Sequence, residues 1–332
     1  MTIEQVSEAT DAALTAFSAD AVEQVQSMTA FMGEAAKAIV ARTERKGIQG
    51  IPTGFSKLDE MLGGLNKGNL IILAARPAMG KTAIALNIAV NAQKEGKNVM
   101  LLSLEMTKNE VFDRYVSITG RIRHSKLRTG DLGEDELDCL NRVCAEVSKQ
   151  DNPLMVDDSG SPTIMDLKAK VRGAHRRKKI DLVIIDYLGL IRDPTTKSRI
   201  DEVSNVSAGL KALAKELDVP VLCLAQLNRG VESRDDKRPM TSDLRDSGSI
   251  EQDADSVSFL YRDVVYNEDT PYKDLAEVLV RKNRHGQTGV AHLQSDLATQ
   301  RFRDYPTQVR TEYLVPRNGG PRDRKAKSAY NP

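Results

Sequence analysis

The stretch from Leu70 to Thr82 constrains the fold more than any other part of the sequence. An apolar run at residues 70–74 is followed by a short turn and then by Gly80-Lys81-Thr82. The apolar run is typical of a buried strand, and the residues after Lys81 are typical of a helix. A strand, a glycine-containing turn and a Gly-Lys-Thr helix start form a phosphate-binding loop, because N–H groups of the turn and of the first helical turn point at phosphate oxygens. The stretch therefore predicts a nucleotide-binding α/β fold.

Individual residues of this loop have separate expected roles. Lys81 would place its charge against the β- and γ-phosphates of ATP, and the Thr82 hydroxyl would ligate Mg²⁺. Backbone contacts to the phosphates are expected from Ala78, Met79, Gly80 and Ala83. Ala75 stands where the motif asks for glycine, which is compatible with the loop if that position needs no positive φ. The alternative is a chance Gly-Lys-Thr on a surface helix, which the flanking strand and helix disfavour.

Three further apolar segments, at residues 99–103, 182–186 and 221–226, alternate with helical segments. Such alternation predicts right-handed crossovers and a mainly parallel sheet. Ligands of these sheets bind beyond the carboxyl ends of the strands. Polar residues stand at three of these ends, namely Glu105, Asp186 and Gln226. We therefore expect them to converge beside the phosphate loop.

Each of these polar residues has a chemical role available. Asp186 would hold the Mg²⁺ water shell opposite Thr82. Glu105 would be the general base that activates or orients the attacking water. Gln226 would sense the γ-phosphate. The alternative is that strand ends are polar because they meet solvent, which is a weaker explanation for three such residues around one phosphate loop.

Charge and cysteine content narrow the class of protein. The 332 residues carry a formal net charge of +1, so any nucleic acid must be held by local contacts or by several subunits together. Cys139, Cys144 and Cys223 form no CxxC pair, which indicates a reduced, cytoplasmic protein without a cysteine metal site. A signal-peptide pattern and a run of about 18 apolar residues are both missing, so no membrane association is expected.

Composition divides the chain into three parts. Residues 1–46 lack proline and carry apolar residues at near-helical spacing, so we expect helices that either pack on their own domain or dock on a neighbouring subunit. Residues 47–305 hold the strand and helix alternation. Residues 306–332, rich in Pro, Gly, Arg and Lys, predict a disordered basic tail. Within the second part, residues 228–255 form a polar connection that is long enough to be functional or disordered.

Seven stretches occur in the order found in the DnaB family of replicative helicases. They are Ile-Pro-Thr-Gly-Phe (51–55), Ala-Ala-Arg-Pro-Ala-Met-Gly-Lys-Thr (74–82), Ser-Leu-Glu-Met (103–106), Ile-Ile-Asp-Tyr-Leu (184–188), Ala-Gln-Leu-Asn-Arg (225–229), Asp-Leu-Arg-Asp-Ser-Gly-Ser-Ile-Glu-Gln-Asp-Ala-Asp (243–255) and Lys-Asn-Arg-His-Gly (282–286). The chain resembles this family over about residues 51–305. The resemblance implies a RecA-like P-loop NTPase core preceded by N-terminal helices. It also implies an ATP-driven motor that forms a homo-oligomeric ring, expected to be hexameric, and moves 5′ to 3′ on single-stranded DNA.

The resemblance also implies roles that the residues alone do not show. Arg114 matches a family arginine near the nucleotide. The segment 282–284 matches a trans-acting group, in which Lys282, Asn283 and Arg284 reach the γ-phosphate held by the next subunit, with Arg284 in a catalytic role. A strand that ends at Lys282 and a turn at His285-Gly286 would project the paired cations from a hairpin tip. The residues alone favour the alternative, a solvated basic hairpin.

The resemblance assigns single-stranded DNA contacts to Arg245, Asp246 and Gly248, with Asp246 standing where the family more often has glutamate. Because the connection at residues 228–255 contains no aromatic residue, base stacking and sequence preference should be weak.

Family members usually carry an amino-terminal helical domain that recruits primase, whereas residues 1–50 alone precede the motor in this sequence. This truncation suits a helicase of phage or plasmid type, or a chain that relies on other proteins for loading. A helicase loader and primase are candidate partners, with the recruitment of primase left open. A second class stays open, namely a RecA- or RadA-type nucleic-acid-binding ATPase that does not unwind. The segment 282–284 and the stretch around Arg245 favour the helicase.

Overall fold

The structure is a computed structural model that describes residues 27–44, 48–244 and 248–306. The chain separates into two compact units, Met1–Gln49 and Gly50–Pro332. Most of the expected amino-terminal helices and the expected basic tail, at residues 1–26 and 307–332, lie outside the described residues. No helix of the described ranges is both long and apolar enough to cross a bilayer.

The described part of the first unit contains helix α2 (Met28–Glu44). Its apolar side chains at Met28, Met32, Ile39 and Val40 are all more than half exposed. These residues belong to the stripe that the near-helical spacing predicts.

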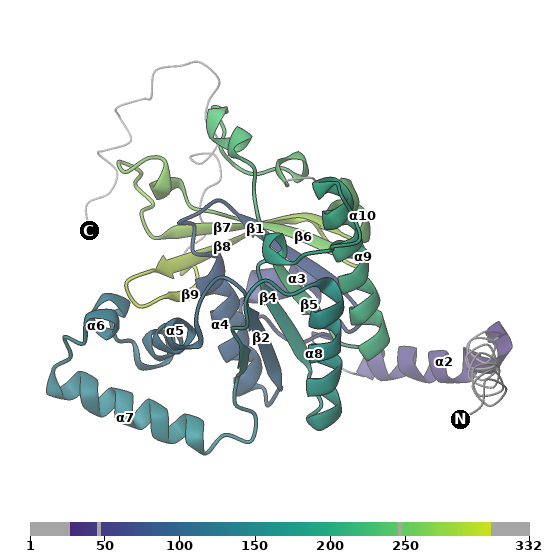
Figure 1. Ribbon diagram of the computed structural model, residues 1–332, viewed down its shortest axis with the longest axis horizontal. Coiled ribbons are helices and arrows are strands. Elements are labelled where there is room, and N and C mark those ends of the chain that lie inside the picture. The colour runs from purple at the N-terminus through teal and green to yellow at the C-terminus, as the bar shows by residue number, and fades with distance from the viewer. Residues whose placement is uncertain (1–26, 45–47, 245–247, 307–332) are drawn as a thin grey trace, which may run out of the picture. The chain divides into compact units, whose positions relative to one another are not determined.

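In the second unit, the described residues form one sheet with the strand order β3-β2-β4-β5-β1-β6-β7-β8-β9 (Figure 1). The strands are β1 (Leu70–Ala75), β2 (Val99–Ser103), β3 (Met155–Asp157), β4 (Leu182–Asp186), β5 (Val221–Gln226), β6 (Ser256–Tyr261), β7 (Leu275–Asn283), β8 (Gly289–Asp296) and β9 (Arg301–Asp304). Neighbours from β3 to β6 pair in parallel, and β6 to β9 pair antiparallel. The predicted mainly parallel α/β sheet is therefore confirmed, with an antiparallel extension at one side.

Helices cover both faces of the sheet (Figure 1). One layer contains α4 (Lys81–Lys94) and α5 (Lys108–Gly120), followed by α6 (His124–Thr129) and α7 (Glu134–Ser148). The other contains α8 (Ile164–Arg177), α9 (Arg199–Leu217) and α10 (Gly248–Asp253). Strands β1, β2, β4 and β6 are buried along their whole length, as strands covered on both faces must be.

Local signals explain where several helices begin and end. Thr107 and Thr163 accept a hydrogen bond from the backbone of Glu110 and Asp166, whose carboxylates bond back, so α5 and α8 both start with a capping box. The helical region between β2 and β3 breaks at residues 121–123 and again around Gly130. Helix α9 begins at Arg199, directly after its N-cap residue Ser198.

The segment before β1 folds back on itself around helix α3 (Ser56–Leu62). Ile51 pairs with Leu65 in an isolated antiparallel bridge. The buried Asp59 carboxylate accepts hydrogen bonds from Thr53 N at 2.7 Å, from Thr53 Oγ1 at 2.8 Å and from Gly54 N at 3.1 Å. The stretch Ile-Pro-Thr-Gly-Phe thus has a structural role, because it fixes the chain that enters the phosphate-loop strand.

Candidate nucleotide and DNA site

The phosphate loop follows β1 and leads directly into α4. Ala75 is the last residue of β1, so the position where the motif asks for glycine does not need a positive φ. The left-handed positions are Ala78 (φ 67°) and Gly80 (φ 94°). Gly80 is the N-cap of α4, and no side chain of the described residues caps this end of the helix. The first N–H groups of a 14-residue helix therefore remain available for an anion.

Lys81 and Thr82 both reach the carboxylate at the end of β4. Thr82 Oγ1 donates a hydrogen bond to Asp186 Oδ2 at 2.5 Å. Lys81 Nζ lies 3.3 Å from Asp186 Oδ1 and 4.5 Å from the centre of the Tyr187 ring. Lys81, Thr82 and Asp186, singled out from the sequence, are thus in direct contact. The aromatic partner Tyr187 was missed, although it follows Asp186 directly in the sequence.

An Mg²⁺ ion fits this pair of oxygen donors. Asp186 Oδ1 is buried and accepts no hydrogen bond from any described residue. A hydroxyl and a carboxylate oxygen are ligands that Mg²⁺ prefers, with phosphates and water completing the shell. Within the described ranges, no group of three or more His, Cys, Asp or Glu side chains forms a separate metal site.

The register of the sheet places the other two polar strand ends beside the loop. Asp186 pairs with Ser103 of β2, and the exposed Glu105 follows two residues later. Gln226, the exposed last residue of β5, pairs with Ala75 of β1. The expected arrangement of polar ends at one edge is therefore observed.

Arg114 on α5 lies close to the same carboxylates. Burial lowers the pKa of the Arg114 guanidinium, while the negative charges of Asp186, Glu110 and Glu105 act in the opposite direction. Arg114 Nη1 donates a hydrogen bond to Gln300 Oε1 at 2.5 Å. Gln300 was missed because it lies in an unremarkable turn almost 200 residues away, and no local signal marks it.

The segment 282–284 lies at the opposite edge of the sheet from the phosphate loop of its own chain. Ala75 is opposite Leu260 on the parallel strand β6, whereas Asn283 is opposite Ser256 at the other end of β6. Four to five residues of strand separate the two edges, which corresponds to about 15 Å. Residues 282–284 therefore cannot reach the nucleotide site of their own chain.

The strand end expected at Lys282 is one residue short, because β7 continues through Asn283, and Arg284 is the first residue of the turn. Both cations are bound within the chain, Lys282 Nζ by Glu251 O and Arg284 by Gln252 O and by Asp255, whose Oδ1 is 3.4 Å from Nη1. Asn283 Nδ2 donates a hydrogen bond to Met61 O at 2.9 Å, which ties the β7–β8 hairpin to helix α3.

Of the three expected DNA contacts, Arg245 and Asp246 lie outside the described residues. Gly248 is the first residue of α10. Backbone contacts hold the chain that leads to residues 245–248. Leu227 pairs with Leu244 in a bridge, and Asn228 N donates a hydrogen bond to Asp243 O at 2.9 Å.

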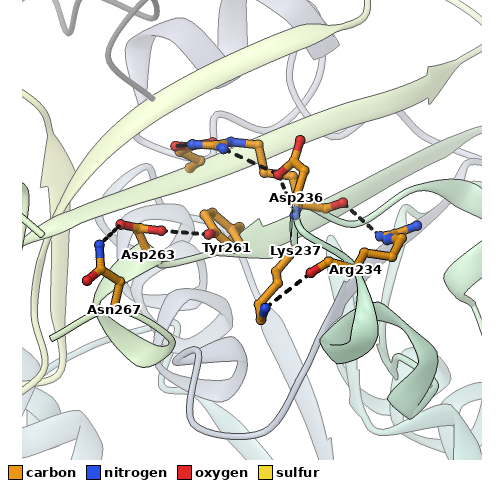
Figure 2. A network of polar contacts seen from close by, with 8 residues as sticks. Arg234, Asp236, Lys237, Tyr261, Asp263 and Asn267 are labelled. Carbon is orange, nitrogen blue, oxygen red and sulfur yellow. Dashed lines mark hydrogen bonds and ion pairs between the residues drawn. The ribbon is translucent and has the colours of Figure 1, made fainter. Parts of the chain in front are cut away.

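A polar network anchors the middle of this connection to the sheet (Figure 2). Arg238 forms a bidentate ion pair with the buried Glu277 of β7, with Nε–Oε2 and Nη2–Oε1 both 2.7 Å. Its guanidinium lies 5.0 Å from the ring centre of Tyr261, whose hydroxyl donates to Asp263 Oδ1 at 2.8 Å. In the same network Arg234 Nη2 is 2.7 Å from Asp243 Oδ2. The first half of the long polar connection is thus held in place.

A cavity of 470 Å³ lies between this connection and the ends of β4 and β5. It is lined by polar and apolar residues that include Tyr187, Arg199, Gln226, Arg229, Leu244 and Ile250. Leu244 and Ile250 flank residues 245–247, so the cavity joins Gln226, which the sequence predicts to sense the γ-phosphate, to the neighbourhood of the expected DNA contacts.

Comparison with known proteins identifies the family of the chain. The family model described as "DnaB-like helicase C terminal domain" matches residues 50–304. The chain belongs to this family. The DnaB-like chain is 46% identical over 249 residues to "Replicative DNA helicase DnaB" of Geobacillus stearothermophilus, which covers 74% of this chain and 54% of that protein. It is 45% identical over 253 residues to "Replicative DNA helicase DnaC" of Bacillus subtilis, covering 75% and 55%. The DnaB-like chain thus spans about half the length of these curated relatives.

Two solved structures show that the DnaB-like fold is the RecA-like ATPase domain. A solved ATPase domain superposes with a TM-score of 0.80 at 36% identity, covering 85% of this chain and all of that one. "The Structure Of A DnaB-Like Replicative Helicase And Its Interactions With Primase" superposes with a TM-score of 0.77 at 35% identity, covering 85% and 68%. The resemblance predicted from the seven stretches is confirmed.

Proposed function

We propose that this chain is the ATP-hydrolysing motor of a DnaB-type replicative helicase. It assembles into a hexameric ring, moves 5′ to 3′ on single-stranded DNA and unwinds the duplex ahead. The observation that carries the proposal is the placement of its two half-sites. The phosphate loop lies at one edge of the sheet, and Arg284 lies about 15 Å away at the other. A complete ATP-hydrolysis site therefore needs Arg284 from a second copy of the chain.

The residues divide the work as follows. The N–H groups at the start of α4 and the Lys81 ammonium bind the phosphates, while Thr82 and Asp186 hold Mg²⁺, which neutralises charge on the β- and γ-phosphates when bound. Glu105 orients and deprotonates the attacking water. Lys282 and Arg284 of the neighbouring subunit leave their own-chain acceptors and stabilise the charge that develops on the γ-phosphate. Asn283 positions this pair by holding the hairpin turn.

Gln226 links the nucleotide to the DNA. It faces the cavity that ends at Leu244 and Ile250, so a γ-phosphate contact at Gln226 changes the wall of the same cavity. We assign single-stranded DNA to Arg245, Asp246 and Gly248, with phosphate contacts predominating over base contacts. The domain limits proposed for this function are 1–46 for the helical segment, 47–305 for the motor and 306–332 for the tail.

The protein partners proposed for this chain are suggested by its relatives. One of the structural neighbours is a DnaB-like replicative helicase whose interactions with primase were studied. For this chain we propose primase and a helicase loader as partners and the cytoplasm as the place of action.

Two measurements test the proposal. Mass photometry with Mg²⁺ and a non-hydrolysable ATP analogue, with and without oligo-dT, should show a hexamer, whereas a persistent monomer would contradict the ring. Strand displacement should then proceed on a fork with a 5′ single-stranded arm and fail on a fork with only a 3′ arm. The Lys81→Ala variant serves as the control for contaminating helicase. Active hydrolysis without displacement on either fork would favour the RecA-type ATPase instead.

A further inference from the structure

The turn between β8 and β9 packs directly on the phosphate loop. A Cβ atom placed on Gly80 would lie 3.1 Å from Phe302 Cζ and 3.2 Å from Leu297 Cδ2, so these side chains cover the loop glycine. Asn87 of α4 clamps the same turn, because its Nδ2 donates to Gln300 O at 2.8 Å and its Oδ1 accepts from Phe302 N at 3.1 Å. The turn is thus fixed to the helix that starts with Lys81 and Thr82.

Gln300 occupies this turn in a conformation that L-residues rarely adopt. Its φ is 55°, and the residue is only 8% exposed. Its amide Nε2 donates to Leu297 O at 2.8 Å, which orients the amide so that Oε1 points at Arg114. The Oε1–Nη1 distance of 2.5 Å makes this a close contact with the guanidinium. A buried side chain held at a positive φ and satisfied at both ends is well determined in position.

Arg114 has a neutral partner in a place where carboxylates are near. Asp186 and Glu105 are close enough to act on its pKa, and Arg114 Nε is buried without a hydrogen bond to the described residues. Gln300 Oε1 is the hydrogen-bond acceptor that holds the group. An amide oxygen fixes the direction of a guanidinium without neutralising its charge, so the full charge remains available to a phosphate.

We propose that Gln300 is a positioning residue for ATP hydrolysis, which holds the Arg114 guanidinium beside the γ-phosphate position between Asp186 and Glu105. The inference rests on the proposed function, because it needs Arg114 to act on the nucleotide. It adds a residue outside the seven stretches that the sequence marks. It also makes the β8–β9 turn part of the nucleotide site.

Gln300→Gly is the primary test, because glycine relieves the positive φ while it removes the amide. Asp218→Gly is the matched control, since Asp218 also has a positive φ (52°) and lies at the exposed end of α9, paired with Lys67 on the surface. Steady-state ATP hydrolysis and thermal unfolding are measured for both. Gln300→Gly should lower kcat/KM for ATP by about 10- to 100-fold, the range expected when a catalytic contact is misplaced by about 1 Å. Asp218→Gly should leave kcat/KM unchanged.

Gln300→Glu is a second variant that keeps the shape of the side chain. A carboxylate at this position pairs with the guanidinium and competes with phosphate for it. The KM for ATP should therefore rise, with a smaller change in the affinity for ADP. An unchanged KM for ATP in Gln300→Glu would contradict the proposal.

A double variant separates positioning from general loosening of the fold. If Gln300 acts through Arg114, the combination Arg114→Ala and Gln300→Gly should be no slower than Arg114→Ala alone. Additive losses would overturn the inference and leave the role of Arg114 intact. Full activity of Arg114→Ala would instead remove Arg114 from the proposed mechanism, and the inference with it.

Discussion

Arg284→Ala should abolish ATP hydrolysis by the assembled ring while leaving nucleotide binding intact. The reason is geometric: Arg284 lies about 15 Å along the sheet from the phosphate loop of its own chain and can serve only the nucleotide of a neighbour. An arginine supplied in this way is worth about 10³ to 10⁵ in rate in related phosphoryl-transfer enzymes. The matched control is Arg281→Ala, because Arg281 is an exposed arginine three residues earlier, on β7.

Rings assembled from two different variants make this prediction quantitative. A Lys81→Ala subunit has a defective loop and an intact Arg284, whereas an Arg284→Ala subunit has the reverse. When the two variants are mixed equally before assembly, the head-to-tail interfaces that combine an intact loop with an intact arginine make up about one quarter of the total. Steady-state ATPase activity should therefore recover to at most about one quarter of the wild-type value, from two proteins that are each inactive alone. Absence of activity at every mixing ratio, or substantial activity of Arg284→Ala alone, would refute trans action.

Three further outcomes are expected. Glu105→Gln should bind ATP normally and lose about 10²- to 10⁴-fold in turnover, as measured by filter binding and single-turnover hydrolysis, and a loss of binding instead would exclude the general-base role. Gly80→Ala should lower the melting temperature of the nucleotide-free protein in calorimetry, because φ is 94° and the new methyl would lie 3.1 Å from Phe302; an unchanged value would show that the loop relaxes. Arg238→Met should lower the free energy of unfolding in urea by about 3 to 5 kcal/mol, because Glu277 is left buried and unpaired, and adding Glu277→Gln should restore part of it. A single variant as stable as the wild type would show that the carboxylate finds another partner.

Much of the site was predictable because its signals are local. A phosphate loop needs a strand, a turn and a helix start in sequence, and the polar residues at Glu105, Asp186 and Gln226 each follow their own apolar run. Parallel pairing then brings such ends together without further information. The same local signals predict that strands and helices alternate, which the structure confirms.

The rest depends on contacts between distant segments, which the sequence does not mark. Gln300 reaches Arg114 only because β9 returns against α4, and Lys282 is bound by the backbone of Glu251 only because the end of β7 lies beside α10. The polar connection after β5 looked functional or disordered, because nothing local reveals that Arg238 anchors it to Glu277 on β7.

The antiparallel extension of the sheet gives β8 two distinct ends. One end leads from the turn that carries Arg284, and the other leads into the turn that covers Gly80 and holds Arg114. Eight residues of extended chain span about 27 Å between them. In the proposed ring, β8 connects the turn at the nucleotide site of its own chain to the turn whose Arg284 serves the nucleotide site of the next subunit.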